Sequence, residues 1–126
     1  MEISSSYIFL SGVRFHSFHG VMPQEQRVGA DFTVDLRVGY DFSAAAADDE
    51  LEHTISYADL FGILKEEMSK PSRLVEHVAG RIGRRIASTY PGVSSIDIVI
   101  KKNNPPMGAD CSGAGVELHL VGRQLK

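Results

Sequence analysis

A lysine occupies a position where the hydrophobic alternation predicts an apolar side chain. Side chains of a β-strand alternate between its two faces, so Ile96, Ile98 and Ile100 share one face of a predicted strand, and Lys102 continues that face. An Asn-Asn-Pro-Pro segment then stops the strand and stiffens the loop that follows. An inward, partly desolvated lysine can act as a general base when its amine is neutral, or as an electrostatic anchor when it is charged. A strand-end lysine that reaches into solvent is the alternative, and the residues alone leave both interpretations open.

Three further side chains have the chemistry to act at such a site. Glu76 falls in the first turn of a predicted helix, where an acidic side chain is favourable to the helix dipole. A carboxylate there could also accept two parallel N–H donors from a guanidine-like fragment of a heterocycle. Tyr57 follows a predicted helix cap, where a tyrosine is more often half-buried core, and Glu25 lies in a predicted loop, where a surface carboxylate is expected.

The five histidines provide no recognisable set of metal ligands. His16 and His19 are three residues apart on or near a strand, so their side chains are expected to point to opposite faces. His53, His77 and His119 stand alone in the sequence. We therefore predict neither a metal centre nor a bound cofactor.

Four segments have the composition and alternation of β-strands. The first spans residues 7–18 and leads into a predicted loop that contains Glu25. The second, residues 31–41, alternates cleanly between apolar and mostly charged side chains, which is typical of a half-buried antiparallel strand. The last two strands end at Lys102 and run through residues 116–120.

Two helices are predicted between the second and third strands, after an acidic connector with a helical turn. Ser56 is expected to cap the first helix in a capping box with Asp59, and Ser72 to cap the second. The positions expected to face the core are Leu60, Phe61, Leu64 and Met68 in the first helix, and Val75, Val78, Ala79, Ile82 and Ile86 in the second.

The order of these elements, β-β-α-α-β-β, predicts an α+β fold whose antiparallel sheet carries two helices on one face. A length of 126 residues corresponds to a single domain, residues 1–126. The outer strands of such a sheet are left unpaired, so we expect copies of the chain to pair with one another along these edges.

The composition and charge argue against several classes of protein. The chain has 43% hydrophobic and 23% charged residues, as ordinary globular proteins do, and its net charge of −3 argues against a nucleic-acid partner. The arginines at positions 81, 84 and 85 are expected on a solvated helix face. Cys111 is the only cysteine, which fits a reducing compartment. We find neither an export signal nor a stretch long enough to span a membrane, so a cytoplasmic location is predicted.

Four short motifs resemble those of the dihydroneopterin aldolase family of the folate pathway. They are F-H-x-F-H-G-V at residues 15–21, with Glu25 behind it, T-I-S-Y-A-D-L-F at 54–61, L-V-E-H-V-A at 74–79 and K-x-x-P-P at 102–106. Each motif alone is weak, whereas the four in the right order on the predicted elements make the resemblance specific. It implies a tunnelling fold, in which the sheets of neighbouring subunits join into a barrel, in a homo-tetramer or homo-octamer with active sites between subunits.

The resemblance also implies roles for individual residues. Lys102 matches the family's catalytic lysine, Tyr57 the residue that reaches in from the adjacent subunit, and Glu25 the acidic residue beside the substrate side chain. Glu76 is similar to the carboxylate that binds the 2-amino and N3 positions of the pterin. The implied pocket is completed by the backbones of Val75, Thr54 and Ile55 and by Val21.

The implied reaction is the retro-aldol cleavage of 7,8-dihydroneopterin, with C2′ epimerisation as a side activity. It needs a base for the 2′-hydroxyl proton and an electron sink, which the pterin supplies through its C6=N5 bond, so we expect no Schiff base and no metal ion. The alternatives are a dihydroneopterin or triphosphate 2′-epimerase, a zinc enzyme of the same fold, and a silent pterin-binding scaffold. The retained K-x-x-P-P motif argues against the epimerase, and the missing set of metal ligands argues against the zinc enzyme. The inward position of Lys102 argues against the silent scaffold.

Overall fold

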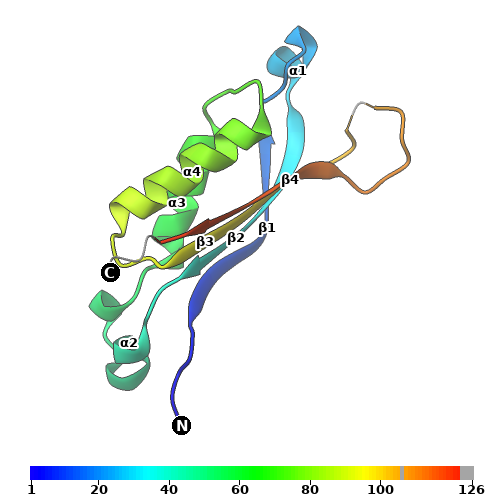
Figure 1. Cartoon of the computed structure of the whole chain (residues 1–126). Coiled ribbons are helices and arrows are strands. Elements are labelled where there is room, and N and C mark those ends of the chain that lie inside the picture. Colours follow the sequence, from blue (N-terminus) through cyan, green and yellow to red (C-terminus); the bar gives the residue numbers. More distant parts are fainter. Residues whose placement is uncertain (106, 123–126) are drawn as a thin grey trace.

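A computed structural model describes residues 1–105 and 107–122 of the chain. Its four strands form one antiparallel sheet in the order β1-β2-β3-β4. The strands are β1 (Tyr7–Ser17), β2 (Ala30–Gly39), β3 (Ser95–Lys102) and β4 (Ala114–Val121). Two long helices, α3 (Tyr57–Met68) and α4 (Val75–Thr89), lie on one face of this sheet (Figure 1), which confirms the predicted α+β arrangement. None of the helices in the described residues has the length and apolar character needed to cross a membrane.

The core fills the space between the helices and this face of the sheet. Because strand side chains alternate, every second residue of the two central strands points at the helices, and these side chains are at most 2% exposed. They are Phe32, Val34, Leu36 and Val38 of β2 and Ile96, Ile98 and Ile100 of β3. The buried side of α4 carries Val78, Ala79, Ile82 and Ile86, as predicted.

The apolar stripe of α3 differs from the prediction at one position. Leu60 and Leu64 are buried as expected, but Phe61 is partly exposed and stacks against Phe15 of β1 at a ring-centroid distance of 6.1 Å. Ile63 is buried instead, because residues three and four positions from Leu60 face the same side of a helix. Phe61 therefore covers the edge of the core rather than its centre.

The starts of the two long helices correct two further predictions. Ser56 caps α3, since its Oγ accepts the N–H of Ala58 at 3.2 Å, but in the described residues no side-chain hydrogen bond from Asp59 completes a capping box. Helix α4 begins two residues later than expected, with Leu74 at its N-cap and no side-chain cap. Ser72 does not cap this helix, because its hydrogen bonds go to other segments.

The segment after β1 is not simply a loop. It contains a short helix, α1 (Pro23–Val28), with Pro23 at its first position, where the fixed φ of proline suits a helix start. Glu25 therefore lies in the first turn of a helix. The acidic connector before α3 contains α2 (Ser43–Asp48) and a 3₁₀ turn, η1 (Leu51–His53), in agreement with the predicted helical turn.

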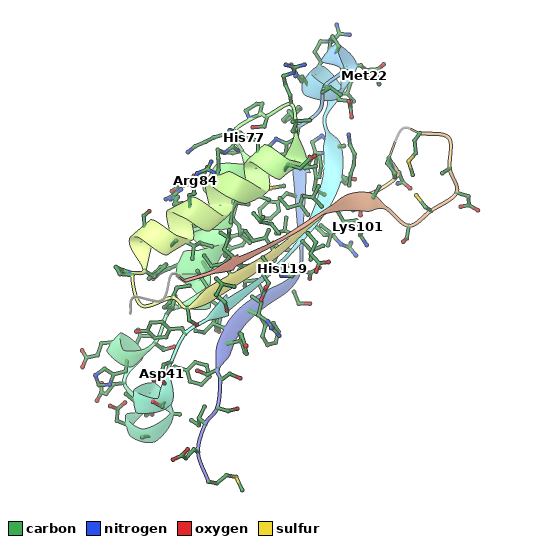
Figure 2. The ribbon with its side chains drawn as sticks, viewed as in Figure 1. Met22, Asp41, His77, Arg84, Lys101 and His119 are labelled. Carbon is green, nitrogen blue, oxygen red and sulfur yellow. The ribbon has the colours of Figure 1, made fainter. Side chains whose placement is uncertain are left out.

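The arginine-bearing face of α4 is only partly solvated, contrary to the prediction. Arg84 is exposed and projects away from the sheet (Figure 2). Arg81 and Arg85 instead turn toward α3, where both bind the carboxylate of Glu67. The helical pattern identified the polar face correctly, but it could not show that a buried carboxylate of the neighbouring helix lies against it.

Candidate active site

A pocket of about 260 Å³ lies at the end of β3, beside the start of α4. Its lining is contributed by residues 19–21 and Glu25, by residues 73–76, by Phe32 and Lys102, and by Pro105 and residues 114–116. The pocket thus joins segments from three of the four motifs found in the sequence. Pro106, the second proline of the K-x-x-P-P motif, lies outside the described residues.

Lys102 and Glu25 form an ion pair inside this pocket. The Nζ atom of Lys102 donates a hydrogen bond to Oε2 of Glu25, and the two side chains are only 16% and 14% exposed. The ammonium also lies 5.7 Å from the ring centroid of Phe32, its neighbour on β2. The hydrogen bond from Lys102 holds the pKa of the Glu25 carboxyl below its usual range, against the opposing effect of burial.

The local sequence explains how Glu25 reaches this place. It lies in the first turn of α1, and its Oε1 accepts the N–H of Met22 at 3.2 Å, which fixes the carboxylate at the helix start. Gly20 makes room for it, because a Cβ at that position would lie 2.5 Å from Cβ and 2.8 Å from Oε1 of Glu25. The glycine of the H-G-V segment thus leaves the space that the Glu25 carboxylate occupies. Strand patterning alone did not reveal this signal.

Lys101 lies on the opposite face of the sheet, as alternation predicts. The pairing of β2 with β3 runs without a register shift from Ser95 to Lys102, so no bulge exchanges the two lysines. Lys101 lines an open hollow of about 560 Å³ on the sheet face away from the helices (Figure 2). That hollow is larger than the pocket. Its lining residues, among them Arg14 and His16, lie on the solvent-facing side of the sheet, so the hollow is separate from the pocket that contains Lys102.

Glu76, Val75 and Val21 all line the pocket. Glu76 is in the first turn of α4 and is exposed, so its carboxylate lies at the rim of the pocket rather than in its depth. Val21 is exposed on the opposite wall. These side chains leave the pocket open to a ligand that enters from solvent.

Tyr57, Thr54 and Ile55 do not line this pocket. The pocket includes His19, which is held by the linker that follows α3, whereas Tyr57 is the first of the 12 residues of that helix, which is about 18 Å long. The Tyr57 side chain is largely exposed, and Ile55 is buried in the core. A single chain therefore does not bring these three residues together with Lys102.

His19 is a pocket residue that the sequence analysis did not single out for this role. Its ring is 1% exposed and packs edge-on against Phe32, and its Nδ1 accepts the N–H of Ser72 at 3.1 Å. Burial, reinforced by the positive charge of Arg81, lowers the pKa of His19 to about 4. The ring is thus neutral at pH 7, and it belongs to the wall of the pocket. In the described residues no group of His, Cys, Asp and Glu side chains is arranged to hold a metal ion.

The four-stranded sheet with two helices on one face and a pocket at the strand ends places the chain among proteins of the tunnelling fold. Solved structures share this fold over almost their whole length. A Vibrio cholerae protein described as a dihydroneopterin aldolase has a TM-score of 0.86 at 23% identity, covering 95% of this chain and 100% of that one. The Escherichia coli dihydroneopterin aldolase in complex with neopterin has a TM-score of 0.84 at 21% identity, covering 91% and 98%.

The chain belongs to the dihydroneopterin aldolase family. The family model described as dihydroneopterin aldolase matches residues 8–119. The dihydroneopterin aldolase of Staphylococcus epidermidis is 37% identical over 112 residues, which cover 88% of this chain and 93% of that protein. The resemblance drawn from the four motifs is thereby confirmed, and the chain is an enzyme of the aldolase type.

Proposed function

We propose that the pocket binds 7,8-dihydroneopterin and cleaves it to 6-hydroxymethyl-7,8-dihydropterin and glycolaldehyde. The observation that carries this proposal is the Lys102–Glu25 ion pair, which sits in a pocket whose rim carries Glu76. Neopterin, the ligand of the Escherichia coli structure, has a guanidine-like edge with two parallel N–H donors. The Glu76 carboxylate has the acceptor geometry for such an edge, helped by the backbone of Val75 and by Val21.

Lys102 is the proposed base of the retro-aldol step. For this step Nζ first gives one proton to the Glu25 carboxylate, its hydrogen-bond partner. The neutral amine, acting directly or through a water molecule, then takes the proton of the 2′-hydroxyl, the C1′–C2′ bond breaks, and C2′ and C3′ leave as glycolaldehyde. The electron pair of the broken bond passes into the C6=N5 bond of the pterin, and C1′ then accepts a proton. Because the substrate itself provides the electron sink, Lys102 need not form a Schiff base. Glu25 orients the substrate side chain and stays paired with Nζ of Lys102 before and after the proton transfer.

Tyr57 is proposed to deliver or position the proton for C1′ from a neighbouring copy of the chain. The support is its exposed position at the start of α3, outside the pocket of its own chain. Thr54 and Ile55 would reach the substrate from the same neighbour through their backbones. We further propose that β1 and β4, the outer strands of the sheet, pair between copies into a barrel, as a homo-tetramer or homo-octamer in which residues 1–126 of each copy act as one domain.

C2′ epimerisation is the proposed side activity. Re-formation of the same C1′–C2′ bond on the other face of glycolaldehyde inverts C2′, so one pocket can carry out both reactions. A cytoplasmic location stays a prediction from the sequence, which fractionation of the source cells would test.

The proposed activity is tested by incubating the purified chain with 7,8-dihydroneopterin in the presence of a metal chelator. We expect 6-hydroxymethyl-7,8-dihydropterin and glycolaldehyde in equal amounts, separated by chromatography. Formation of the C2′ epimer without glycolaldehyde would identify an epimerase instead, and pterin binding without any product would identify a silent binding protein. Loss of turnover on addition of the chelator would contradict the metal-free mechanism.

A further inference from the structure

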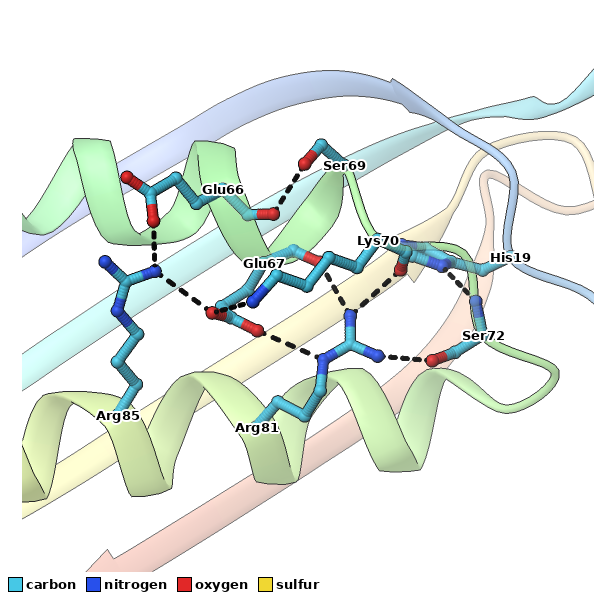
Figure 3. Close-up of polar contacts among 8 residues, drawn as sticks. All are labelled: His19, Glu66, Glu67, Ser69, Lys70, Ser72, Arg81 and Arg85. Atoms are coloured by element: carbon cyan, nitrogen blue, oxygen red, sulfur yellow. Dashed lines mark hydrogen bonds and ion pairs between the residues drawn. The ribbon is translucent and has the colours of Figure 1, made fainter.

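One guanidinium group ties together three segments behind the pocket (Figure 3). Arg81 of α4 donates from Nε to Oε1 of Glu67 at 3.1 Å, and from Nη2 to the backbone carbonyls of Glu67 and Lys70 at 2.7 and 3.0 Å. Its Nη1 donates to Oγ of Ser72. The side chain therefore binds one carbonyl in the last turn of α3, that of Glu67, and also holds the linker between α3 and α4 at Lys70 and Ser72.

Ser72 passes this attachment on to the segment after β1. Its backbone N–H donates to Nδ1 of His19 at 3.1 Å, and its carbonyl accepts the N–H of Gly20 at 2.9 Å. The N–H and the carbonyl of Ser72 thereby join the linker to His19 and Gly20, by one hydrogen bond each. We call the hydrogen bonds that connect Arg81, Ser72, His19 and Gly20 the linker clamp.

The linker clamp sits between the two walls of the pocket. One wall consists of residues 19–21, and the other consists of residues 73–76, which follow Ser72 directly. Gly20 also lies directly against Glu25, because its missing Cβ leaves the space that the carboxylate fills. The two walls are therefore joined by the backbone hydrogen bonds of Ser72, whose hydroxyl is bound by Arg81, a residue that does not line the pocket itself.

Other cations can replace Arg81 at the Glu67 carboxylate, but no other described residue can replace it at the Ser72 hydroxyl. The Glu67 carboxylate also receives Lys70 and Arg85, each at 3.0 Å, so Arg81 is one of three cations that neutralise it. The hydroxyl of Ser72, in contrast, has Arg81 as its only hydrogen-bond partner among the described residues. Loss of Arg81 should thus leave Glu67 paired while it releases the linker.

We propose that Arg81 is a positioning residue for substrate binding, which acts through Ser72 to set the spacing of the two pocket walls. The proposal rests on the proposed function, because the walls are taken to hold the pterin ring. Lys102 lies on β3, outside the linker clamp, so the clamp should affect binding of the ring more than the proton transfer. The specific expectation is a higher KM with a nearly unchanged kcat.

The test compares Arg81→Gln and Ser72→Ala with Arg84→Gln, an exposed arginine of the same helix. We expect the KM for 7,8-dihydroneopterin to rise about tenfold in Arg81→Gln and about threefold in Ser72→Ala, with kcat within about threefold of the wild type. Arg84→Gln should leave both constants unchanged. The dissociation constant of neopterin, measured by calorimetry, should rise in parallel with KM.

Ser72→Ala keeps the proposal falsifiable if Arg81→Gln does not fold, because it leaves all the cations of Glu67 in place. A lower thermal midpoint with unchanged KM and unchanged neopterin affinity in these variants would assign Arg81 a purely stabilising role and overturn the proposal. Absence of turnover in the wild type would count against the proposed function instead. In that case the neopterin dissociation constants alone decide whether the linker clamp positions the walls.

Discussion

Two carboxylates of the chain are both largely shielded from solvent, yet their surroundings differ. Glu25 binds one cation, Lys102, and one backbone N–H, that of Met22. Glu67 is 4% exposed and binds three cations, Lys70, Arg81 and Arg85, at 3.0 to 3.1 Å. We refer to these as the pocket pair and the helix network.

The difference lies in the hydrogen-bonding capacity that each arrangement leaves for a ligand. An ammonium group has three N–H donors, and in the described residues Lys102 uses one of them, for Glu25. Both carboxylate oxygens of Glu67 are occupied. Burial opposes ionisation of Glu67, but the hydrogen bonds from Lys70, Arg85 and Arg81 together hold its pKa below the usual range. A saturated network stabilises the fold, whereas an unsaturated pair beside a pocket can engage a substrate.

Removal of the lysine should break the pocket pair at the level of activity. We expect Lys102→Ala to lower the rate of 7,8-dihydroneopterin cleavage by about 10²–10⁴-fold, because it removes the proposed general base. Lys101→Ala, on the same strand but the opposite face, is the matched control and should retain nearly full activity. Steady-state product formation measures both. Equal losses in the two variants would show that local charge, rather than position, matters.

Removal of the carboxylate should break the helix network at the level of stability. Glu67→Gln leaves Arg81 partly buried without its counter-charge, while Arg85 keeps only the exposed Glu66, so we expect a loss of about 3–5 kcal/mol in the free energy of unfolding. Glu66→Gln removes only an exposed partner of Arg85 and should cost less than about 1 kcal/mol. Urea denaturation at a fixed protein concentration measures both values, since assembly makes stability depend on concentration.

The buried histidine between the two regions should make stability depend on pH. Because the pKa of His19 falls from 6.5 to about 4 on folding, the unfolded chain binds a proton in this range that the folded chain does not. Its contribution, about 3 kcal/mol, is fully present above pH 6.5 and is lost as the pH falls toward 4. Asparagine cannot be protonated in this range. The free energy of unfolding of the wild type minus that of His19→Asn, measured by urea denaturation at each pH, should therefore fall by this amount as the pH is lowered from above 6.5 toward 4.

Taking the difference in the free energy of unfolding between the wild type and His19→Asn also cancels the opposing effect of two other histidines, which both proteins retain. Hydrogen bonds to carboxylates raise the pKa of His16, by way of Asp31, and of His119, by way of Asp97. These residues contribute stability at low pH that is lost as the pH rises. A difference between the wild type and His19→Asn that stays constant with pH would contradict the assignment to His19.

Two glycine substitutions should sharpen the comparison with a smaller effect. A methyl group at Gly20 meets Glu25, so Gly20→Ala should displace the carboxylate from Lys102 and lower the rate about tenfold. At Gly62 in α3 a Cβ meets nothing within 4 Å, so Gly62→Ala should raise stability by about 0.5–1 kcal/mol without changing the rate. Rates and denaturation midpoints of the two variants provide the test. An unchanged rate in Gly20→Ala would mean that Glu25 does not need its present position.

The sequence predicted best those features that depend on local periodicity. The inward direction of Lys102 follows from three isoleucines at alternate positions, and the structure confirms it. Its partner Glu25 is 77 residues away and reaches it through a short helix that starts at Pro23, so no local pattern could show the contact. The arginines of α4 were misjudged for the same reason, because Glu67 of another helix decides their environment.

Tyr57 marks a different limit of prediction. Its position at the start of α3 was predicted correctly, yet its own chain does not bring it to the pocket. Only contacts between copies of the chain could do so, and these depend on the edges of β1 and β4 rather than on any local pattern around Tyr57.

The central claim is that Lys102 carries out chemistry rather than holding the ligand, and neopterin binding to Lys102→Ala tests it most directly. Titration calorimetry of this variant should yield a dissociation constant within about threefold of the wild-type value, while its turnover is lost. If neopterin affinity falls in proportion to the rate, Lys102 is a binding residue and the proposed mechanism is wrong.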